Sequence, residues 1–107
     1  MRALIAHVLG AAGFDVCEAA DADETVSQWR AVRPDVIVLD QRMPPTSGME
    51  VAGVILAAEP TQVIFLFTAF VDAEIRAEAK RVGIAACVSK DQVFEIPELV
   101  RAQFNRE

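Results

Sequence analysis

Two short, continuous apolar runs constrain the fold of this chain more than any other feature: residues 36–39 and residues 63–67. Apolar runs of this length, without polar alternation, are typical of strands that are covered on both faces. The segment between them repeats apolar residues at helical spacing and ends at Pro60. A helix between two buried strands indicates a parallel pair that is joined by a right-handed crossover.

The same alternation of helix and strand runs along the whole chain. The apolar residues Leu4, Ile5, Val8 and Leu9 predict a first helix, which ends at Gly13. Residues 14–18 alternate as an edge strand would, and Asp21 or Asp23 can cap the next helix. Residues 75–82 form a further helix, residues 85–89 a last strand, and Ile96 opens a last helix. We therefore predict an α/β fold: a doubly wound parallel sheet in three α/β/α layers, with four strands and five helices, in one domain over residues 1–107.

Composition excludes several classes of function. The net charge of −6 offers little attraction to nucleic acid or to an anionic membrane surface. No apolar run approaches the roughly 20 residues that a membrane-spanning helix needs, so we expect a cytoplasmic location. Cys17 and Cys87 lie in separate strand-like segments without metal-ligand spacing, and we interpret both as small buried thiols.

Three polar residues follow three successive predicted strands: Asp40, Thr68 and Lys90. Parallel strands deliver their carboxyl ends to one edge of a sheet, which is where such folds bind ligands. An aspartate is a nucleophile toward phosphorus, a hydroxyl donates to a phosphoryl oxygen, and an ammonium neutralises its charge. Each residue alone is commonly a loop cap or a solvated side chain, but their joint placement indicates a phosphoryl site.

At these positions the chain resembles the receiver domain of bacterial two-component response regulators. The run D-Q-R-M-P-P-T-S-G from Asp40 to Gly48 is similar to the family's D-x-x-M-P-x-x-x-G pattern, and Thr68 and Lys90 match its later site positions. The resemblance implies a flavodoxin-like fold with strand order 2-1-3-4-5, and a signalling domain rather than an enzyme. It also implies that a histidine kinase or phosphotransfer protein phosphorylates Asp40, with Thr68 and Lys90 binding the phosphoryl oxygens. Mg²⁺ would be held by Asp40 and the backbone carbonyl of Arg42.

The chain departs from this family at its beginning. Receivers start with a strand that ends in an acidic pair, whereas this sequence opens inside the first helix. We expect an opening of about 10 Å between residues 14–18 and residues 36–39, where that strand would lie. Several outcomes remain open. The missing strand is supplied upstream in the full protein, or residues 14–18 close onto residues 36–39, or a dimer partner fills the gap by swapping an element. In the remaining case the chain is a poorly folded remnant.

The residues around Asp40 argue against two other classes of protein. Haloacid-dehalogenase-like phosphatases need a second Asp where Arg42 stands, and flavodoxin-like cofactor binding needs a Ser/Thr/Gly-rich loop that the sequence lacks. The serious alternative is a pseudo-receiver, a protein-interaction module that works without phosphorylation. Cys87, in place of an aromatic residue, and Asp91, in place of the proline that usually follows the family's lysine, are compatible with it. Partners or a second copy would dock on the face formed by the fourth helix, fifth strand and fifth helix.

Overall fold

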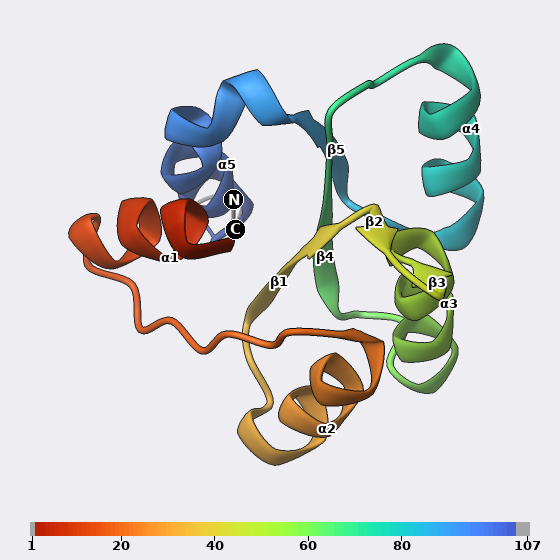
Figure 1. The fold of residues 1–107 in the computed structure, drawn as a ribbon, viewed down its shortest axis with the longest axis horizontal. Helices are drawn as coiled ribbons and strands as arrows, with labels where there is room; N and C mark the ends of the chain where they lie inside the picture. The colour runs from red at the N-terminus through yellow and green to blue at the C-terminus, as the bar shows by residue number, and fades with distance from the viewer. Residues whose placement is uncertain (1, 105–107) are drawn as a thin grey trace.

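A three-stranded parallel sheet lies at the centre of the computed structural model, which describes residues 2–104. Its strands are β1 (Val36–Asp40), β4 (Val63–Thr68) and β5 (Ala86–Ser89), in the order β1-β4-β5. The three strands lie side by side in Figure 1. Both pairs are parallel, with Val36 opposite Val63 and Phe65 opposite Ala86. The two apolar runs thus form adjacent strands, as their pattern predicts.

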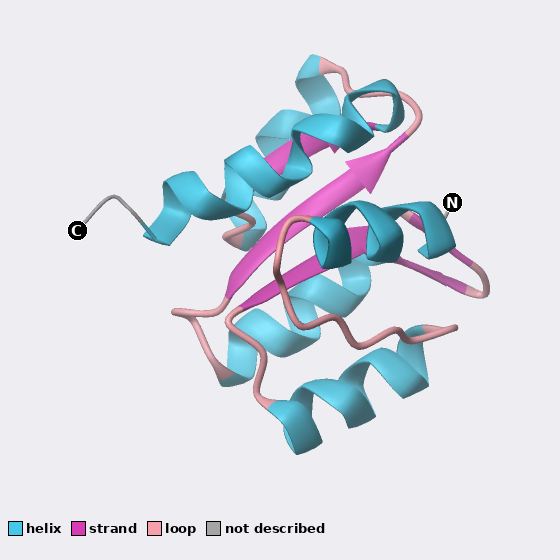
Figure 2. Cartoon of the chain, turned by 90° about the vertical axis from the view of Figure 1, so that its left-hand side faces the viewer, coloured by secondary structure: helices cyan, strands magenta, loops and turns pink. Residues whose placement is uncertain are grey.

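Within residues 2–104, five α-helices cover the two faces of this sheet. α1 (Arg2–Ala11) and α5 (Ile96–Phe104) lie on one face, and α2 (Ala22–Val32), α3 (Gly48–Ala58) and α4 (Ala73–Val82) on the other (Figures 1 and 2). A 3₁₀ helix, η1 (Lys90–Glu95), joins β5 to α5. The three-layer α/β/α arrangement with five helices is confirmed. None of the helices within residues 2–104 is long and apolar enough to cross a membrane.

Alternating side chains of the strands build two cores, one on each face of the sheet. Ile37 and Leu39 of β1 pack with Trp29 and the apolar residues of α3. On the other face, Phe65 and Phe67 of β4 pack with apolar residues of β5, η1 and α5: Val88, Val93, Ile96 and Val100. Because both faces are covered, the central strands contain no polar alternation.

Local signals in the sequence set the helix ends. Asp21 and Asp72 cap α2 and α4, each accepting at 2.8 Å a backbone N–H from the residue three positions later. α1 ends at Ala11; Gly13, just beyond it, has a left-handed φ of 97°, and the Phe14 N–H donates to the Leu9 carbonyl at 3.1 Å. These caps satisfy backbone groups that a helix leaves unpaired at its ends. The choice of Asp21 over Asp23 is therefore decided by the observed hydrogen bond.

The predicted strand at residues 14–18 is wrong. This segment is extended coil, and the parallel sheet of residues 2–104 has three strands where we predicted four. A strand needs a neighbour that takes up its backbone hydrogen bonds, and no described strand pairs with residues 14–18. Cys17 is consequently exposed, not buried as predicted, whereas Cys87 is half-buried and packs against the core.

A small hairpin replaces part of the loop that we predicted after the first central strand. β2 (Arg42–Met43) and β3 (Thr46–Ser47) pair in antiparallel fashion, with Arg42 opposite Ser47. Ser47 then caps α3, since its hydroxyl accepts the Glu50 N–H at 3.2 Å. The hairpin therefore carries the chain directly from Asp40 at the end of β1 to the start of α3.

Candidate functional site

Asp40, Thr68 and Lys90 lie at one edge of the sheet because the strands that carry them are in register. Asp40, the last residue of β1, is opposite Phe67, so that Thr68 follows one position later on β4. Thr68 in turn is opposite Ser89, the last residue of β5, and Lys90 comes next. The predicted convergence of three strand ends is therefore observed.

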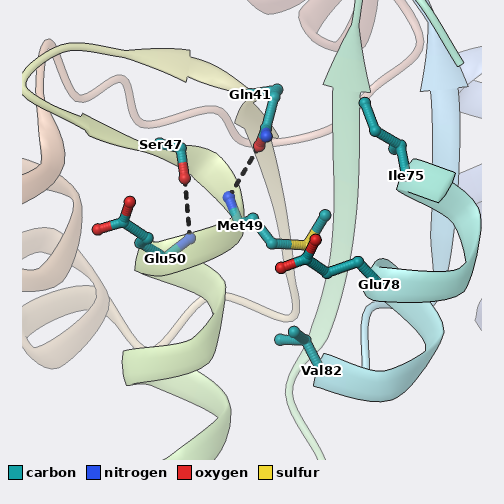
Figure 3. Close-up of a pocket in the computed structure, with 7 residues that line it drawn as sticks. All are labelled: Gln41, Ser47, Met49, Glu50, Ile75, Glu78 and Val82. Atoms are coloured by element: carbon teal, nitrogen blue, oxygen red, sulfur yellow. Dashed lines mark hydrogen bonds between the residues drawn. The ribbon is translucent and has the colours of Figure 1, made fainter.

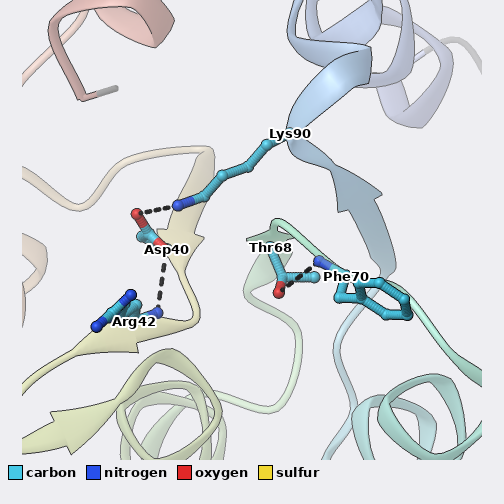
Figure 4. A network of polar contacts seen from close by, with 5 residues as sticks. All are labelled: Asp40, Arg42, Thr68, Phe70 and Lys90. Atoms are coloured by element: carbon cyan, nitrogen blue, oxygen red, sulfur yellow. Dashed lines mark hydrogen bonds and ion pairs between the residues drawn. The ribbon is translucent and has the colours of Figure 1, made fainter.

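Asp40 and Lys90 form an ion pair across this edge. The Lys90 Nζ lies 3.2 Å from the Asp40 Oδ2, with the two side chains 25% and 35% exposed respectively (Figure 4). The other carboxylate oxygen, Oδ1, accepts the backbone N–H of Arg42 at 3.0 Å. Each carboxylate oxygen of Asp40 is therefore held by one donor, and the partly exposed side chain remains accessible from solvent.

Thr68 is close to this pair in the fold, but its hydroxyl has a different partner. The Thr68 Oγ1 accepts the backbone N–H of Phe70 at 3.4 Å, and the residue is only 8% exposed (Figure 4). No interaction between Thr68 and Asp40 is observed. The structure therefore joins Asp40 with Lys90 directly and places Thr68 on the neighbouring strand, where its hydroxyl is held by its own loop.

Gln41 shapes the site, and our sequence analysis missed it. Its N–H donates to the Phe67 carbonyl at 2.9 Å, which continues the β1–β4 pairing past Asp40. Its carbonyl accepts the Gly48 N–H at 3.0 Å, and its side-chain Oε1 accepts the Met49 N–H at 2.9 Å. Gln41 therefore closes the hairpin onto the start of α3. A lone glutamine in a loop carries no sequence signal for such a role.

A small open pocket lies beside the hairpin, between α3 and α4. It has a volume of about 350 Å³. Gln41, Met49 and Ile75 contribute to its walls, and Glu50 and Glu78 place carboxylates at its rim (Figure 3). Asp40, Thr68 and Lys90 do not line it. The convergent polar groups are therefore at the sheet edge, outside this pocket.

The comparison with protein families identifies the domain in which Asp40, Thr68 and Lys90 share this sheet edge. A family model described as the response regulator receiver domain matches residues 1–102. The chain belongs to this family. Receiver domains act in two-component signalling, and phosphorylation by a histidine kinase is their general role. The predicted family, its flavodoxin-like fold and its signalling function are confirmed.

Individual relatives support the receiver assignment. Chemotaxis protein CheY of Listeria monocytogenes is 28% identical over 103 residues, which cover 92% of this chain and 87% of that protein. The crystal structure of Vibrio cholerae CheY4 superposes with a TM-score of 0.83 at 29% identity, covering 98% of this chain and 87% of that one. Protein-glutamate methylesterase/protein-glutamine glutaminase of Haloarcula marismortui is 40% identical over 67 residues, which are 62% of this chain and only 18% of that protein. The chain therefore spans less than a fifth of this longer relative.

Receiver domains generally bind Mg²⁺ at the phosphorylation site. Mg²⁺ prefers six oxygen ligands, usually with more than one carboxylate or phosphate among them. Within residues 2–104 no group of three or more His, Cys, Asp or Glu side chains is placed to hold a metal ion. Asp40 and the carbonyl of Arg42, the two ligands that the family resemblance implies, are by themselves too few. The described residues do not fit a Mg²⁺ site on their own.

Proposed function

We propose that Asp40 is the phosphoacceptor of this receiver domain, and that a histidine kinase or phosphotransfer protein donates the phosphoryl group. The observation that carries the proposal is the 3.2 Å contact between the Asp40 Oδ2 and the Lys90 Nζ. It sets a nucleophilic oxygen beside a positive charge at the carboxyl edge of a parallel sheet, where ligands bind in folds of this type.

The geometry supports an in-line transfer to the Oδ2 atom. Oδ1 is held by the Arg42 N–H, which leaves Oδ2 to attack phosphorus. The new Asp40 O–P bond forms as the P–N bond of the donor phosphohistidine breaks, and the imidazole nitrogen takes the electron pair of that bond. The Lys90 ammonium then moves from the carboxylate to an oxygen of the transferred phosphoryl group, whose charge it neutralises.

Thr68 would complete the set of donors after transfer. Before transfer, its hydroxyl oxygen accepts the Phe70 N–H at 3.4 Å, which is longer and weaker than an ordinary N–H···O hydrogen bond. A phosphoryl oxygen on Asp40 is a stronger, charged acceptor for the hydroxyl proton. In this proposal Thr68 therefore donates to the phosphoryl group, and the 68–70 loop adjusts with it.

Phosphorylation by a small donor tests the acceptor role. We expect acetyl phosphate, in buffer with Mg²⁺, to add one hydroxylamine-sensitive phosphoryl group, detected by intact mass and by a mobility shift on a phosphate-affinity gel. Asp40→Asn removes the nucleophile and should abolish the product. Asp35→Asn is the matched control, because Asp35 lies exposed just before the same strand, and it should leave phosphorylation intact. Product that persists in Asp40→Asn overturns the proposal.

The alternative is a pseudo-receiver that binds its partner without phosphorylation. Two observations favour it: the described residues do not complete a Mg²⁺ site, and Cys87 stands half-buried on β5 where the family resemblance implies an aromatic residue. No product from wild-type protein, with its folding verified by circular dichroism, would select this alternative.

The proposal also covers the extent and location of the domain. Residues 1–107 form one receiver domain without catalytic turnover of its own, and it works in the cytoplasm.

The docking surface is the face of α4, β5 and α5. Partners, or a second copy in a homodimer, bind there, where Arg76, Lys80 and Arg81 of α4 are exposed. Cross-linking from cysteines introduced on this face would test the docking surface.

A further inference from the structure

The turn between β5 and η1 carries Lys90, and the side chain of Gln92 closes this turn. The Gln92 Oε1 accepts the backbone N–H of Ser89, the last residue of β5, at 3.2 Å. Lys90 and Asp91 lie between the two bonded residues. We infer that Gln92 is a positioning residue, which holds the Lys90 backbone where the ammonium group reaches Asp40. Its part in phosphoryl transfer rests on the proposed function of Asp40, whereas its hold on Lys90 does not.

Burial fixes the backbone on both sides of this turn but not within it. Val88 of β5 is 1% exposed and Val93 of η1 is 4% exposed, and both belong to the core on the α5 side of the sheet. The residues between them are half-buried or exposed. Core packing therefore places the two ends of the segment. A hydrogen bond within the segment then sets the direction in which the Lys90 side chain starts.

The residue after Lys90 shows why this turn needs a side-chain hydrogen bond. Asp91 stands where the family resemblance implies a proline, and aspartate lacks the ring that would restrict φ. η1 is also irregular, since Gln92, with φ of −102° and ψ of 21°, departs from helical geometry. A glutamine whose side chain returns to the backbone N–H before a helix fixes the first turn. Gln92 therefore supplies a constraint that the backbone of residues 90 and 91 does not.

The ion pair between Lys90 and Asp40 depends on such a constraint. The Lys90 Nζ lies 3.2 Å from the Asp40 Oδ2, and Figure 4 shows the lysine side chain extended from the turn toward the carboxylate. Both side chains are partly exposed, so solvent weakens their attraction, and the flexible lysine loses rotamer freedom when the pair forms. A small displacement of the Lys90 backbone is therefore enough to reduce the time that the ammonium spends on the carboxylate.

Chemical acetylation measures this contact without any phosphorylation. Lys80 and Lys90 are the two lysines of the chain, and Lys80 is exposed on α4. The Lys90 amine must leave Asp40 before it can attack N-hydroxysuccinimide acetate, so the contact slows its acetylation. We expect Gln92→Ala to raise the ratio of Lys90 to Lys80 acetylation, measured by peptide mass spectrometry, about two- to tenfold, the factor that one ordinary hydrogen bond corresponds to. Asp40→Asn should also raise this ratio, whereas Gln103→Ala, the same substitution on α5, should not.

Phosphorylation by acetyl phosphate, in buffer with Mg²⁺, tests the role of Gln92 in transfer. Gln92→Ala should lower the rate about two- to tenfold. Gln92→Glu keeps an accepting oxygen for the Ser89 N–H and should have the wild-type rate. In the Lys90→Ala background, Gln92→Ala should change the rate no further, because a residue that acts only through Lys90 then has nothing to position. A general loss of stability would instead give additive effects.

The two measurements separate failure of this inference from failure of the proposed function. An acetylation ratio that Gln92→Ala leaves unchanged would overturn the inference. So would a ratio that Asp40→Asn leaves unchanged, because no contact would then exist for Gln92 to hold. Additive losses in the double variant, or a rate in Gln92→Glu as low as in Gln92→Ala, would overturn the part of Gln92 in transfer. Wild-type protein that is not phosphorylated, yet shows the raised ratio in Gln92→Ala, would refute the proposed function of Asp40 and support the hold on Lys90.

Discussion

Gly48 lies against the backbone carbonyl of Asp40, so closely that a Cβ atom at position 48 would overlap the carbonyl oxygen and come within 2.9 Å of the Leu66 Cδ1. The glycine of the D-x-x-M-P-x-x-x-G pattern is thus required by the strand end that it faces. We expect Gly48→Ala to lower the free energy of unfolding by about 1–3 kcal/mol, the usual cost of overpacking a tight site. Urea denaturation measures this change.

Gly53, in the same helix, is the matched control. Nothing lies within 4 Å of a Cβ atom built at this position. Gly53→Ala should therefore raise the free energy of unfolding by about 0.5–1 kcal/mol, because alanine loses less backbone entropy in a helix. Equal effects of the two substitutions would contradict the proposed contact between Gly48 and Asp40.

Replacing Lys90 should impair phosphorylation without preventing folding. Lys90→Ala removes the ammonium that lies 3.2 Å from the acceptor oxygen, so the charge that develops in the transfer is no longer neutralised. We expect the rate of phosphorylation by acetyl phosphate to fall roughly ten- to hundredfold. Lys80→Ala, at an exposed position of α4, serves as the control and should keep the wild-type rate. An unchanged rate in Lys90→Ala would remove Lys90 from the site.

The cap of α4 makes a separate contribution to stability. The Asp72 Oδ1 accepts the Ile75 N–H at 2.8 Å. Asp72→Ala should cost about 1 kcal/mol of unfolding free energy, whereas Asp72→Ser keeps an accepting oxygen and should cost much less. Thermal unfolding of the two variants, compared at equal pH, distinguishes loss of the cap from a general effect of removing a charge.

The two cysteines should react with alkylating reagents at different rates. Burial of the Cys87 thiol raises its pKa, and the positive charge of Arg76 opposes this shift only in part. At a given pH below that pKa, Cys87 therefore has less of the reactive thiolate than an unperturbed thiol. Cys17 is exposed and should be alkylated first. Mass spectrometry of Cys17→Ser and Cys87→Ser proteins during iodoacetamide treatment measures each rate separately.

The same shift gives a pH dependence of stability. Because the folded protein holds the Cys87 proton more tightly than the unfolded chain does, the thiol contributes stability below the unfolded pKa, and that contribution is lost as pH rises through the folded pKa. Stability of the wild type should therefore fall more between neutral and alkaline pH than that of Cys87→Ala. Parallel denaturation curves at the two pH values provide the measurement.

The sheet and its strand ends were predictable because their signals are local. The buried runs at residues 36–39 and 63–67 needed no information beyond their own apolar pattern. Asp40 and Thr68 follow from where those two strands stop, and Lys90 from where the predicted strand at residues 85–89 stops. Residues 14–18 carry an equally good local pattern and nevertheless form coil. Strand formation depends on a neighbour, and alternation within a segment cannot reveal whether that neighbour is present.

The details of the site depended on contacts between distant segments. Thr68 donates nothing to Asp40 and instead accepts from Phe70, a choice made by the shape of the loop after β4. The role of Gln41 arises from its simultaneous contacts with β4 and with the start of α3. Threonine and glutamine have no residue-type preference for these contacts that would make either arrangement predictable from the sequence.

The register of the three parallel strands also has a consequence for how the protein folds. Asp40 ends β1, Lys90 directly follows β5, and the two residues meet only because β4 aligns both strands. The ion pair therefore cannot form in a partly assembled sheet, since each crossover must first close a long loop. The protein should therefore be able to accept a phosphoryl group only at the end of folding. Incompletely folded and misfolded chains would then not be phosphorylated and would not signal.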